Sequence, residues 1–279
     1  MSSRRDIEIR LGSLNEIKEI MNAMKNLSLM EVHKLGRFLE SQRRVIDTIE
    51  SAAADLLQFH PALFPSNATF REFYLLVGSE RGFCGDFNEA LVRALGQHGV
   101  TAREKSVVVI GAKLATKFAD DARLRAAISG ASVAEEIDGV LIELMDVLTE
   151  TGVRGASDGP LRLTVLHHEP GQEQVVMTLL QPLPPAPLEA KRYSHAPLLY
   201  LEPQRFLTGL VEQYLFAGLH ELLYSSLLAE NQRRMQHMDA AVRRLDETCA
   251  ELVRTRNILR QEEITEEIEV IMLSVEALK

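Results

Sequence analysis

Two stretches at opposite ends of the chain repeat apolar residues at alternating steps of four and three, and this pattern constrains the fold most strongly. Such spacing is typical of the contact line of a coiled coil, here termed the seam. No proline interrupts residues 7–56, so a single helix can carry the first seam. The positions of the N-terminal seam are Ile7, Leu11, Leu14, Lys18, Met21, Lys25, Ser28, Val32, Leu35, Leu39, Gln42, Ile46, Ile49, Ala53 and Leu56.

A second seam begins at Met235 and shifts by one residue between Leu259 and Ile264. The shift predicts that the C-terminal helix continues alone beyond the end of the other helix. Because the two seams match, we expect the ends of the chain to wrap around each other. The C-terminal seam consists of Met235, Met238, Val242, Leu245, Cys249, Leu252 and Leu259, and it resumes at Ile268, Ile271, Val275 and Leu278.

The length of these helices is itself informative. At 1.5 Å per residue, a helix over residues 4–57 would be about 80 Å long and one over residues 205–278 about 110 Å long. A small domain is about 30 Å across, so neither helix fits inside one. The sequence therefore predicts a projecting rod, which is a shape suited to transmitting force, setting a spacing or holding partners.

Between the helices, short apolar runs alternate with amphipathic stretches. This alternation predicts a small open sheet with helices packed on it. The expected strands cover residues 72–78, 106–111, 161–168 and 174–180, and the expected helices cover residues 87–96, a stretch from residue 112 and residues 133–149. Proline-containing stretches at 65–67 and 182–187 are the expected linkers on either side.

The composition argues against some classes of function and indicates a cellular compartment. A formal net charge of −9 argues against general nucleic-acid binding. The two cysteines, Cys84 and Cys249, are far apart and predict no disulfide framework, which fits a reducing cytoplasm. No segment resembles a signal peptide, and none approaches the roughly 18 apolar residues of a membrane span. We expect a soluble protein with no direct membrane insertion, although it can sit on a membrane complex.

The C-terminal helix separates its charges into an arginine-rich collar followed by an acidic tip. A solvated helix face with internal pairs explains this pattern, and so does a collar that meets acidic surfaces of a partner. The arginines are Arg233, Arg234, Arg243, Arg244, Arg254, Arg256 and Arg260, and the acidic tip contains Glu262, Glu263, Glu266, Glu267 and Glu269.

The sequence contains no convincing catalytic motif. Residues 78–85 lack the lysine and hydroxyl of a phosphate-binding loop. Cys84 lies in a glycine-rich loop where a nucleophile could be exposed, but without a nearby base a small buried filler is favoured. His167 and His168 would face opposite sides of a strand, so they cannot share a metal. Paired glutamates at an exposed helix tip favour solubility over acid–base chemistry. We predict no active site, no cofactor and no metal.

Three segments resemble the gamma subunit of F-type ATP synthases. Residues 9–25 (I-R-L-G-S-L-N-E-I-K-E-I-M-N-A-M-K) are similar to the family pattern I-R-x-x-I-x-S-I-x-N-T-x-K-I-T-x-A-M. Residues 79–88 (S-E-R-G-F-C-G-D-F-N) resemble S-D-R-G-L-C-G-G-F-N. Residues 256–268 (R-N-I-L-R-Q-E-E-I-T-E-E-I) resemble Y-N-K-A-R-Q-A-S-I-T-Q-E-L. The order and spacing of the motifs fit a gamma subunit over nearly the whole chain.

The resemblance implies a mixed fold of α/β or α+β class. A long antiparallel coiled coil would be formed by residues 1–58 and 205–279, with a small open-sheet α/β domain at residues 70–200. It also implies a non-catalytic rotor shaft that couples ion flow through the membrane c ring to ATP synthesis or hydrolysis in the beta subunits. The implied partners are the alpha, beta and epsilon subunits and the c ring, at the cytoplasmic face of a bacterial inner membrane.

The resemblance also implies roles for individual residues of this chain. The resemblance implies that a set of side chains contacts the beta subunit, some of them at the contact known as the catch; for each, ordinary helix solvation or seam packing is the alternative. The implied contact residues are Met24, Arg234, Arg260, Gln261, Thr265 and Glu267.

The chain also departs from the family pattern. Glu31 stands where the family usually has lysine, Glu262 and Glu263 replace a pair of small residues, and Arg243 and Arg244 replace a common Asp-Asn. These changes indicate a divergent branch, and a second ATPase system with its own partners is one hypothesis. Two other interpretations stay open from the sequence, namely a stand-alone coiled-coil adaptor with an α/β head and an enzyme that uses Cys84.

Overall fold

The computed structural model describes residues 4–63, 71–97, 106–150, 161–180, 195–196 and 198–276. The expected linkers at 65–67 and 182–187 lie outside these ranges. The chain forms two compact units: unit 1 contains residues 1–28 and 235–279, and unit 2 contains residues 29–234. This division differs from the three sequence segments, because each unit takes part of both long helices.

Both long helices are present almost as predicted. Helix α1 runs from Arg4 to Phe59 and contains 56 residues, and helix α5 runs from Pro203 to Glu276 and contains 74 residues. Every position of the N-terminal seam, and every position of the C-terminal seam from Met235 to Leu259, is buried or partly buried. The heptad-like spacing therefore identified the packed side of each helix.

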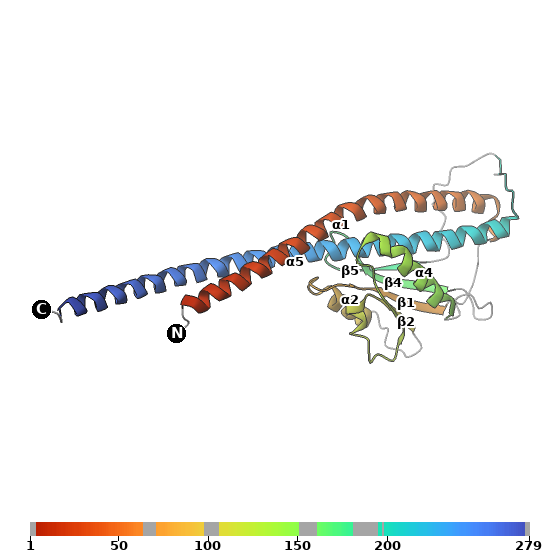
Figure 1. The fold of residues 1–279 in the computed structure, drawn as a ribbon. Coiled ribbons are helices and arrows are strands. Elements are labelled where there is room, and N and C mark those ends of the chain that lie inside the picture. Colours follow the sequence, from red (N-terminus) through yellow and green to blue (C-terminus); the bar gives the residue numbers. More distant parts are fainter. Residues whose placement is uncertain are drawn as a thin grey trace. The chain divides into compact units, whose positions relative to one another are not determined.

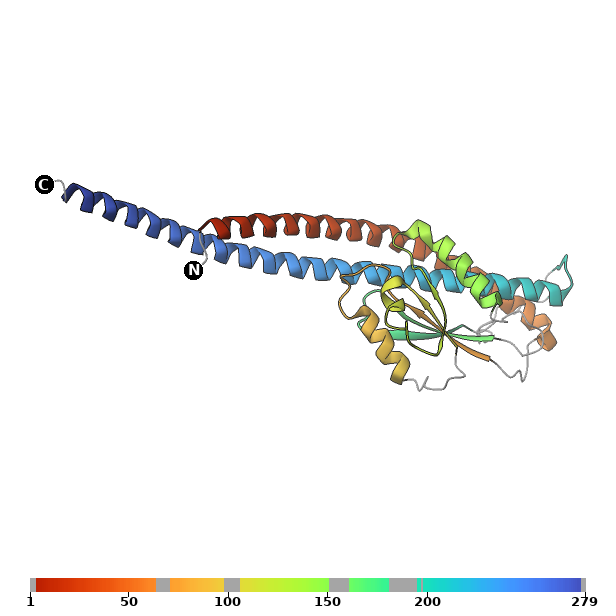
Figure 2. The same ribbon diagram turned by 60° about the horizontal axis from the view of Figure 1, so that its bottom comes forward.

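Within unit 1 the two helices are antiparallel and lie side by side (Figures 1 and 2). Three ion pairs cross between them, and residue numbers rise along α1 as they fall along α5. The pairs are Arg4–Glu263 at 2.8 Å, Lys18–Asp246 at 2.7 Å and Lys25–Asp239 at 2.9 Å. The antiparallel coiled coil is therefore confirmed in this unit.

Beyond the shift in the seam, the side chains of helix α5 are no longer packed against another helix of unit 1. All described residues from 264 to 275 are exposed, including the seam positions Ile268, Ile271 and Val275. Helix α1 begins at Arg4, and Arg4 already pairs with Glu263. Within unit 1, the end of α5 thus continues past the paired part of α1, as the shift predicted.

Unit 2 contains a five-stranded sheet with the order β3-β2-β1-β4-β5. Strands β1 to β4 are parallel, and β5 is antiparallel to β4. The turn between β4 and β5 contains Gly171 at a positive φ of 75°. The strands are β1 (Arg71–Val77), β2 (Ser106–Ile110), β3 (Leu124–Ile128), β4 (Leu161–His168) and β5 (Val175–Leu180).

Helices cover both faces of the sheet. Because the central strands are buried on both sides, their sequences are continuously apolar. On one face Phe73, Leu75 and Val77 pack with α4 (Ile137–Leu148), with α5 and with Leu35 and Leu39 of α1. On the other face, the apolar side chains of the sheet pack with α2 (Phe87–Gln97) and with the single turn α3 (Ala112–Ala115). Figure 2 shows the sheet between these two layers.

Three details of the α/β domain differ from the sequence predictions. Strand β3 was not predicted, because Leu124–Ile128 contains two alanines and lies at a sheet edge where most of its side chains are at least partly exposed. The helix expected from residue 112 lasts only four residues. The helix expected at residue 133 begins as a 3-10 turn, η2 (Ala134–Glu136), before α4 starts at Ile137.

Candidate functional site

The guanidinium of Arg234 lies at the centre of a buried polar cluster in unit 2. Its Nε donates to the carbonyl oxygen of Gly82 at 3.2 Å, and its Nη1 donates to Oδ1 of Asn231 at 3.0 Å. Nη2 of Arg234 forms an ion pair with the carboxylate of Glu230, and both side chains of this pair are almost fully buried. The charge of Arg234 is therefore paired inside the chain, and its contact with a partner stays a prediction.

Cys84 belongs to the same cluster and is not suited to nucleophilic chemistry. The side chain is 4% exposed, and its Sγ lies 3.4 Å from Nη2 of Arg234. The pKa of the thiol is raised to about 12, mainly by burial and secondly by the negative charge of Glu230. At neutral pH the group is a thiol and not the reactive thiolate. The interpretation of Cys84 as a small buried filler is therefore supported by its burial and its pKa.

The loop of residues 79–86 is fixed at its base. The amide of Ser79 donates to Oδ1 of Asn88 at 3.0 Å, and Nδ2 of Asn88 donates to the Ser79 hydroxyl at 2.8 Å. Gly78 has no room for a side chain, because a Cβ there would lie 2.4 Å from Cβ of Leu114. At the tip, Phe83 has a positive φ of 66° and is 61% exposed. A rigid base thus presents an exposed aromatic ring in a conformation that is unfavourable for phenylalanine.

The two histidines of β4 are structural. Nε2 of His167 lies 3.0 Å from Oγ1 of Thr178, whereas Nε2 of His168 donates to the carbonyl oxygen of Phe87 at 2.9 Å. Desolvation lowers the pKa of both imidazoles. Their ring nitrogens therefore have different partners, as expected for adjacent residues on a strand. No group of three or more His, Cys, Asp or Glu side chains in the described ranges is placed to hold a metal ion.

The remaining predicted contact residues belong to unit 1. Met24 is partly buried on α1, next to Lys25, which pairs with Asp239 of α5. The others lie on the exposed part of α5, where the Thr265 hydroxyl bonds the backbone carbonyl of Gln261 at 2.9 Å. The structure brings together on one stretch of helix the residues Arg260, Gln261, Thr265 and Glu267.

Two departures from the family pattern have local roles. Glu31 accepts a hydrogen bond from the amide of Ala134 at 3.3 Å, at the start of η2. A carboxylate suits the free N–H groups at the beginning of a helix, where the lysine of the family would not. Glu263 pairs with Arg4 across the coil. Both acids therefore stabilise packing within their own unit.

Sequence reasoning missed Glu230 and Asn231, which are 3% and 2% exposed. They directly follow the apolar run Leu227, Leu228 and Ala229 on α5, so a polar pair inside a buried face was visible as a pattern. Arg234 pairs with Glu230 from the next turn of the same helix, whereas Cys84, whose Sγ lies 4.0 Å from Oε1 of Glu230, is 146 positions earlier in the chain, and only the fold brings it there.

The fold and these surfaces define a class of protein. A long antiparallel helix pair is combined with an open α/β sheet, the polar cluster is buried and internally satisfied, and the exposed charged and apolar side chains lie on a bare helix end. These features are typical of a protein whose helices offer a surface for partners. Among the described helices, none combines the length and the apolar character needed to cross a membrane.

Comparison with known proteins identifies the family. The family model described as ATP synthase matches residues 3–278, so the chain belongs to this ATP synthase family. The ATP synthase gamma chain of Polaromonas sp. (strain JS666 / ATCC BAA-500) is 25% identical over 305 residues, covering 99% of this chain and 100% of that protein. The resemblance to gamma subunits expected from the three motifs is thereby confirmed.

Solved structures show the same fold at low sequence identity. A chain in the cryo-EM structure of the Euglena gracilis mitochondrial ATP synthase, OSCP/F1/c-ring, rotational state 3, matches with a TM-score of 0.61 at 16% identity, covering 99% of this chain and 94% of that chain. A chain in the central stalk/c-ring structure of the Tetrahymena thermophila mitochondrial ATP synthase matches with a TM-score of 0.56 at 16% identity, covering 80% of this chain and 99% of that chain.

Proposed function

We propose that the chain is the central rotor shaft of an F-type ATP synthase or ATPase and that it works without catalytic chemistry of its own. In this role α1 and α5 pass through a ring of alternating alpha and beta subunits. An asymmetric shaft presents different faces to the three beta subunits, so its rotation changes the relative free energies of their nucleotide-binding states. The family match over residues 3–278 favours this role over a stand-alone adaptor.

One observation on this chain itself supports the proposal. The end of α5 is exposed over all its described residues from 260 to 275, and it combines acids with large apolar side chains. The exposed apolar residues are Ile264, Ile268, Val270, Ile271, Met272, Leu273 and Val275, each at least 46% exposed. An exposed apolar stretch of this kind is typical of a surface that a partner covers.

We assign the contacts with the beta subunit to Met24, Arg260, Gln261, Thr265 and Glu267. Arg260 can donate charge-assisted hydrogen bonds to a carboxylate of the partner, since its side chain is exposed. Arg234 also belongs to the predicted contact set, and within the chain its charge is paired with Glu230. The further partners in this proposal are the alpha and epsilon subunits and the c ring, with the complex at the cytoplasmic face of a bacterial inner membrane.

Replacement of Arg260 tests the contact assignment. In the assembled complex, Arg260→Ala should reduce ATP-driven ion pumping more than ATP hydrolysis, because coupling depends on the shaft contact while the fold of the shaft does not depend on this exposed side chain. Pumping and hydrolysis are measured on the same inverted vesicles. Unchanged pumping per ATP hydrolysed would remove Arg260 from the contact set.

Arg254→Ala is the matched control, since Arg254 is an exposed arginine on the same helix, outside the matched motif. Equal losses from both variants would indicate a general effect of charge. Purification tests the role itself: the tagged chain should co-purify with alpha and beta subunits, whereas a chain recovered without them would favour the adaptor.

A further inference from the structure

One side chain joins the loop of residues 79–86, which follows β1, to two neighbouring loops of unit 2. Oε2 of Glu80 accepts a hydrogen bond from the amide of Ala112 at 2.8 Å and another from the amide of Gly130 at 2.6 Å. Ala112 follows β2 and Gly130 follows β3, and the parallel strands β1, β2 and β3 are neighbours in the sheet. A single carboxylate oxygen therefore connects the loops at the carboxyl ends of three strands.

The acceptor of these two amides is a side chain and not a neighbouring strand. The amide of Gly111, the first residue after β2, still donates to the carbonyl oxygen of Ile128 in β3 at 2.9 Å. The next amide, that of Ala112, donates to Glu80. A backbone N–H group needs an acceptor of another kind once its strand has ended, and a carboxylate forms stronger hydrogen bonds than a neutral acceptor. Loop amides that converge on one oxygen form an anion-binding concavity.

Two glycines allow the three loops to approach closely enough for this contact. A Cβ at Gly130 would lie 3.1 Å from Oε2 of Glu80 and 3.1 Å from Cα of Gly111. Gly111 has a φ of 104°, and a Cβ there would lie 2.7 Å from the carbonyl oxygen of Ser79. A side chain at either position would crowd the loops, so the concavity is lined by backbone atoms.

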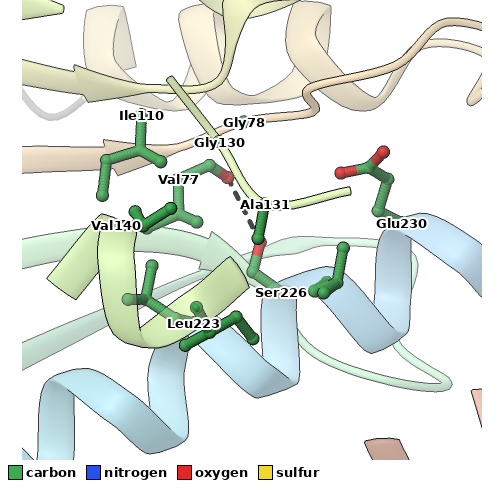
Figure 3. Close-up of a pocket in the computed structure, with 11 residues that line it drawn as sticks. Val77, Gly78, Ile110, Gly130, Ala131, Val140, Leu223, Ser226 and Glu230 are labelled. Atoms are coloured by element: carbon green, nitrogen blue, oxygen red, sulfur yellow. Dashed lines mark hydrogen bonds between the residues drawn. The ribbon is translucent and has the colours of Figure 1, made fainter. Parts of the chain in front are cut away.

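The space beside Gly130 is too small for a large ligand. Figure 3 shows Gly78 and Gly130, on segments that follow strands, beside a cavity of about 20 Å³ that Ser226 and Glu230 of α5 also line. That volume holds about one water molecule. The position next to the two amides therefore suits a group no larger than a carboxylate. Its donors lie on two different loops, so it does not depend on the N-terminus of the single turn α3 alone.

We propose that the amides of Ala112 and Gly130 form a carboxylate-binding site and that Glu80 is its internal ligand, which holds the loop of residues 79–86 against the sheet. Arg81 adds a second contact with the segment between β3 and η2, since its Nε donates to the Ser132 hydroxyl at 3.0 Å. Truncation of Glu80 should open the site to a small carboxylate from solution and should release the loop. This inference does not depend on the rotor role.

Chemical rescue of a truncated side chain tests the proposal on the full-length chain. Glu80→Ala removes a group with the size and charge of acetate, so the urea midpoint of unfolding should fall. Sodium acetate should then raise the midpoint in a saturable manner, and sodium chloride at equal ionic strength should not. An effect of acetate no larger than that of chloride would overturn the proposal.

The controls are the wild-type chain, Glu80→Gln and Glu143→Ala. Glu80→Gln keeps an acceptor oxygen in the site, so it should lose less stability than Glu80→Ala and gain nothing from acetate. Glu143 is an exposed glutamate on α4 of the same unit, and its replacement leaves Glu80 in the site. A saturable gain from acetate in these controls equal to that in Glu80→Ala would show that acetate acts elsewhere, which contradicts the proposal.

Limited proteolysis measures whether the site holds the loop. Phe83 is 61% exposed at the loop tip, and chymotrypsin cleaves after phenylalanine. Glu80→Ala should be cut after Phe83 at least about tenfold faster than the wild-type chain, as expected for the loss of hydrogen bonds to a charged acceptor. Acetate should slow this cleavage in Glu80→Ala and leave it unchanged in Glu80→Gln. Equal cleavage rates in Glu80→Ala and wild type would show that Glu80 does not hold the loop.

Amide hydrogen exchange on the wild-type chain provides a test that does not require a variant to fold. The amides of Ala112 and Gly130 should exchange as slowly as the amide of Gly111, which donates to a strand. Exchange as fast as that of exposed loop amides in the same protein would show that Glu80 does not occupy the site.

Discussion

The coil of unit 1 and the α/β domain of unit 2 are stabilised by different interactions. Among the described residues of unit 1, the buried apolar side chains are Ile7, Leu11 and Met238, and most other seam positions are only partly buried. Ion pairs such as Lys18–Asp246 and Lys25–Asp239 cross between its helices at their partly exposed margins. Unit 2 instead buries an apolar cluster on each face of its sheet, together with the Arg234–Glu230 pair.

This difference shows what each unit needs from its surroundings. Two helices alone cannot enclose their side chains, so a two-stranded coil leaves much of its apolar surface in contact with solvent or with a partner. A sheet covered on both faces has a core of its own. We therefore expect unit 2 to resist unfolding in the isolated chain, and unit 1 to gain most of its stability in the assembled complex.

The largest effect is expected from breaking the buried ion pair of unit 2. Arg234→Ala leaves the Glu230 carboxylate buried without its cation, which should lower the free energy of unfolding by about 3–5 kcal/mol. Urea denaturation of the isolated chain, followed by circular dichroism, measures this loss. Arg233→Ala is the control, since its neighbouring and more exposed side chain bonds Asp86 and the backbone of Glu173, and it should cost less than about 1 kcal/mol. Comparable losses would contradict the assignment.

An intermediate effect is expected from pH, again in unit 2. Desolvation holds the pKa of His167 and His168 below the ordinary value of 6.5. Between the lowered values and 6.5 the unfolded chain binds more protons, so the free energy of unfolding should decrease as the pH falls below about 6.5. Urea denaturation at a series of pH values measures the slope. Replacement of both histidines by glutamine should flatten it, whereas His33→Gln, at an exposed position, should not.

The smallest effect is expected in the coil of unit 1. Lys25→Ala removes the ion pair with Asp239, so the midpoint of thermal loss of helicity should fall slightly at low salt. The difference from wild type should vanish near about 1 M salt, where the Debye length is only about 3 Å. Arg10→Ala, which removes an exposed cation from the same helix, should change the midpoint less. A difference that persists at high salt would mean that the coil depends on packing at Lys25 instead of charge.

The sequence by itself determined the features that depend on local periodicity. The seam spacing predicted both long helices, their packed sides and the point where α5 continues alone, because a helix displays its contacts at regular intervals. Continuous apolar runs predicted β1, β2 and β4, since strands covered on both faces need apolar side chains at every position. Three motifs predicted the family.

Only the tertiary structure decided the features that depend on contacts between distant residues. Strand β3 forms beside β2 although its own side chains give little signal. Arg234 fits an exposed collar by its sequence position, yet it is buried because the loop of residues 79–86 and Glu230 surround its guanidinium. Burial and pairing of charges depend on which segments meet in space, and helical or strand periodicity records only which side of one element is apolar.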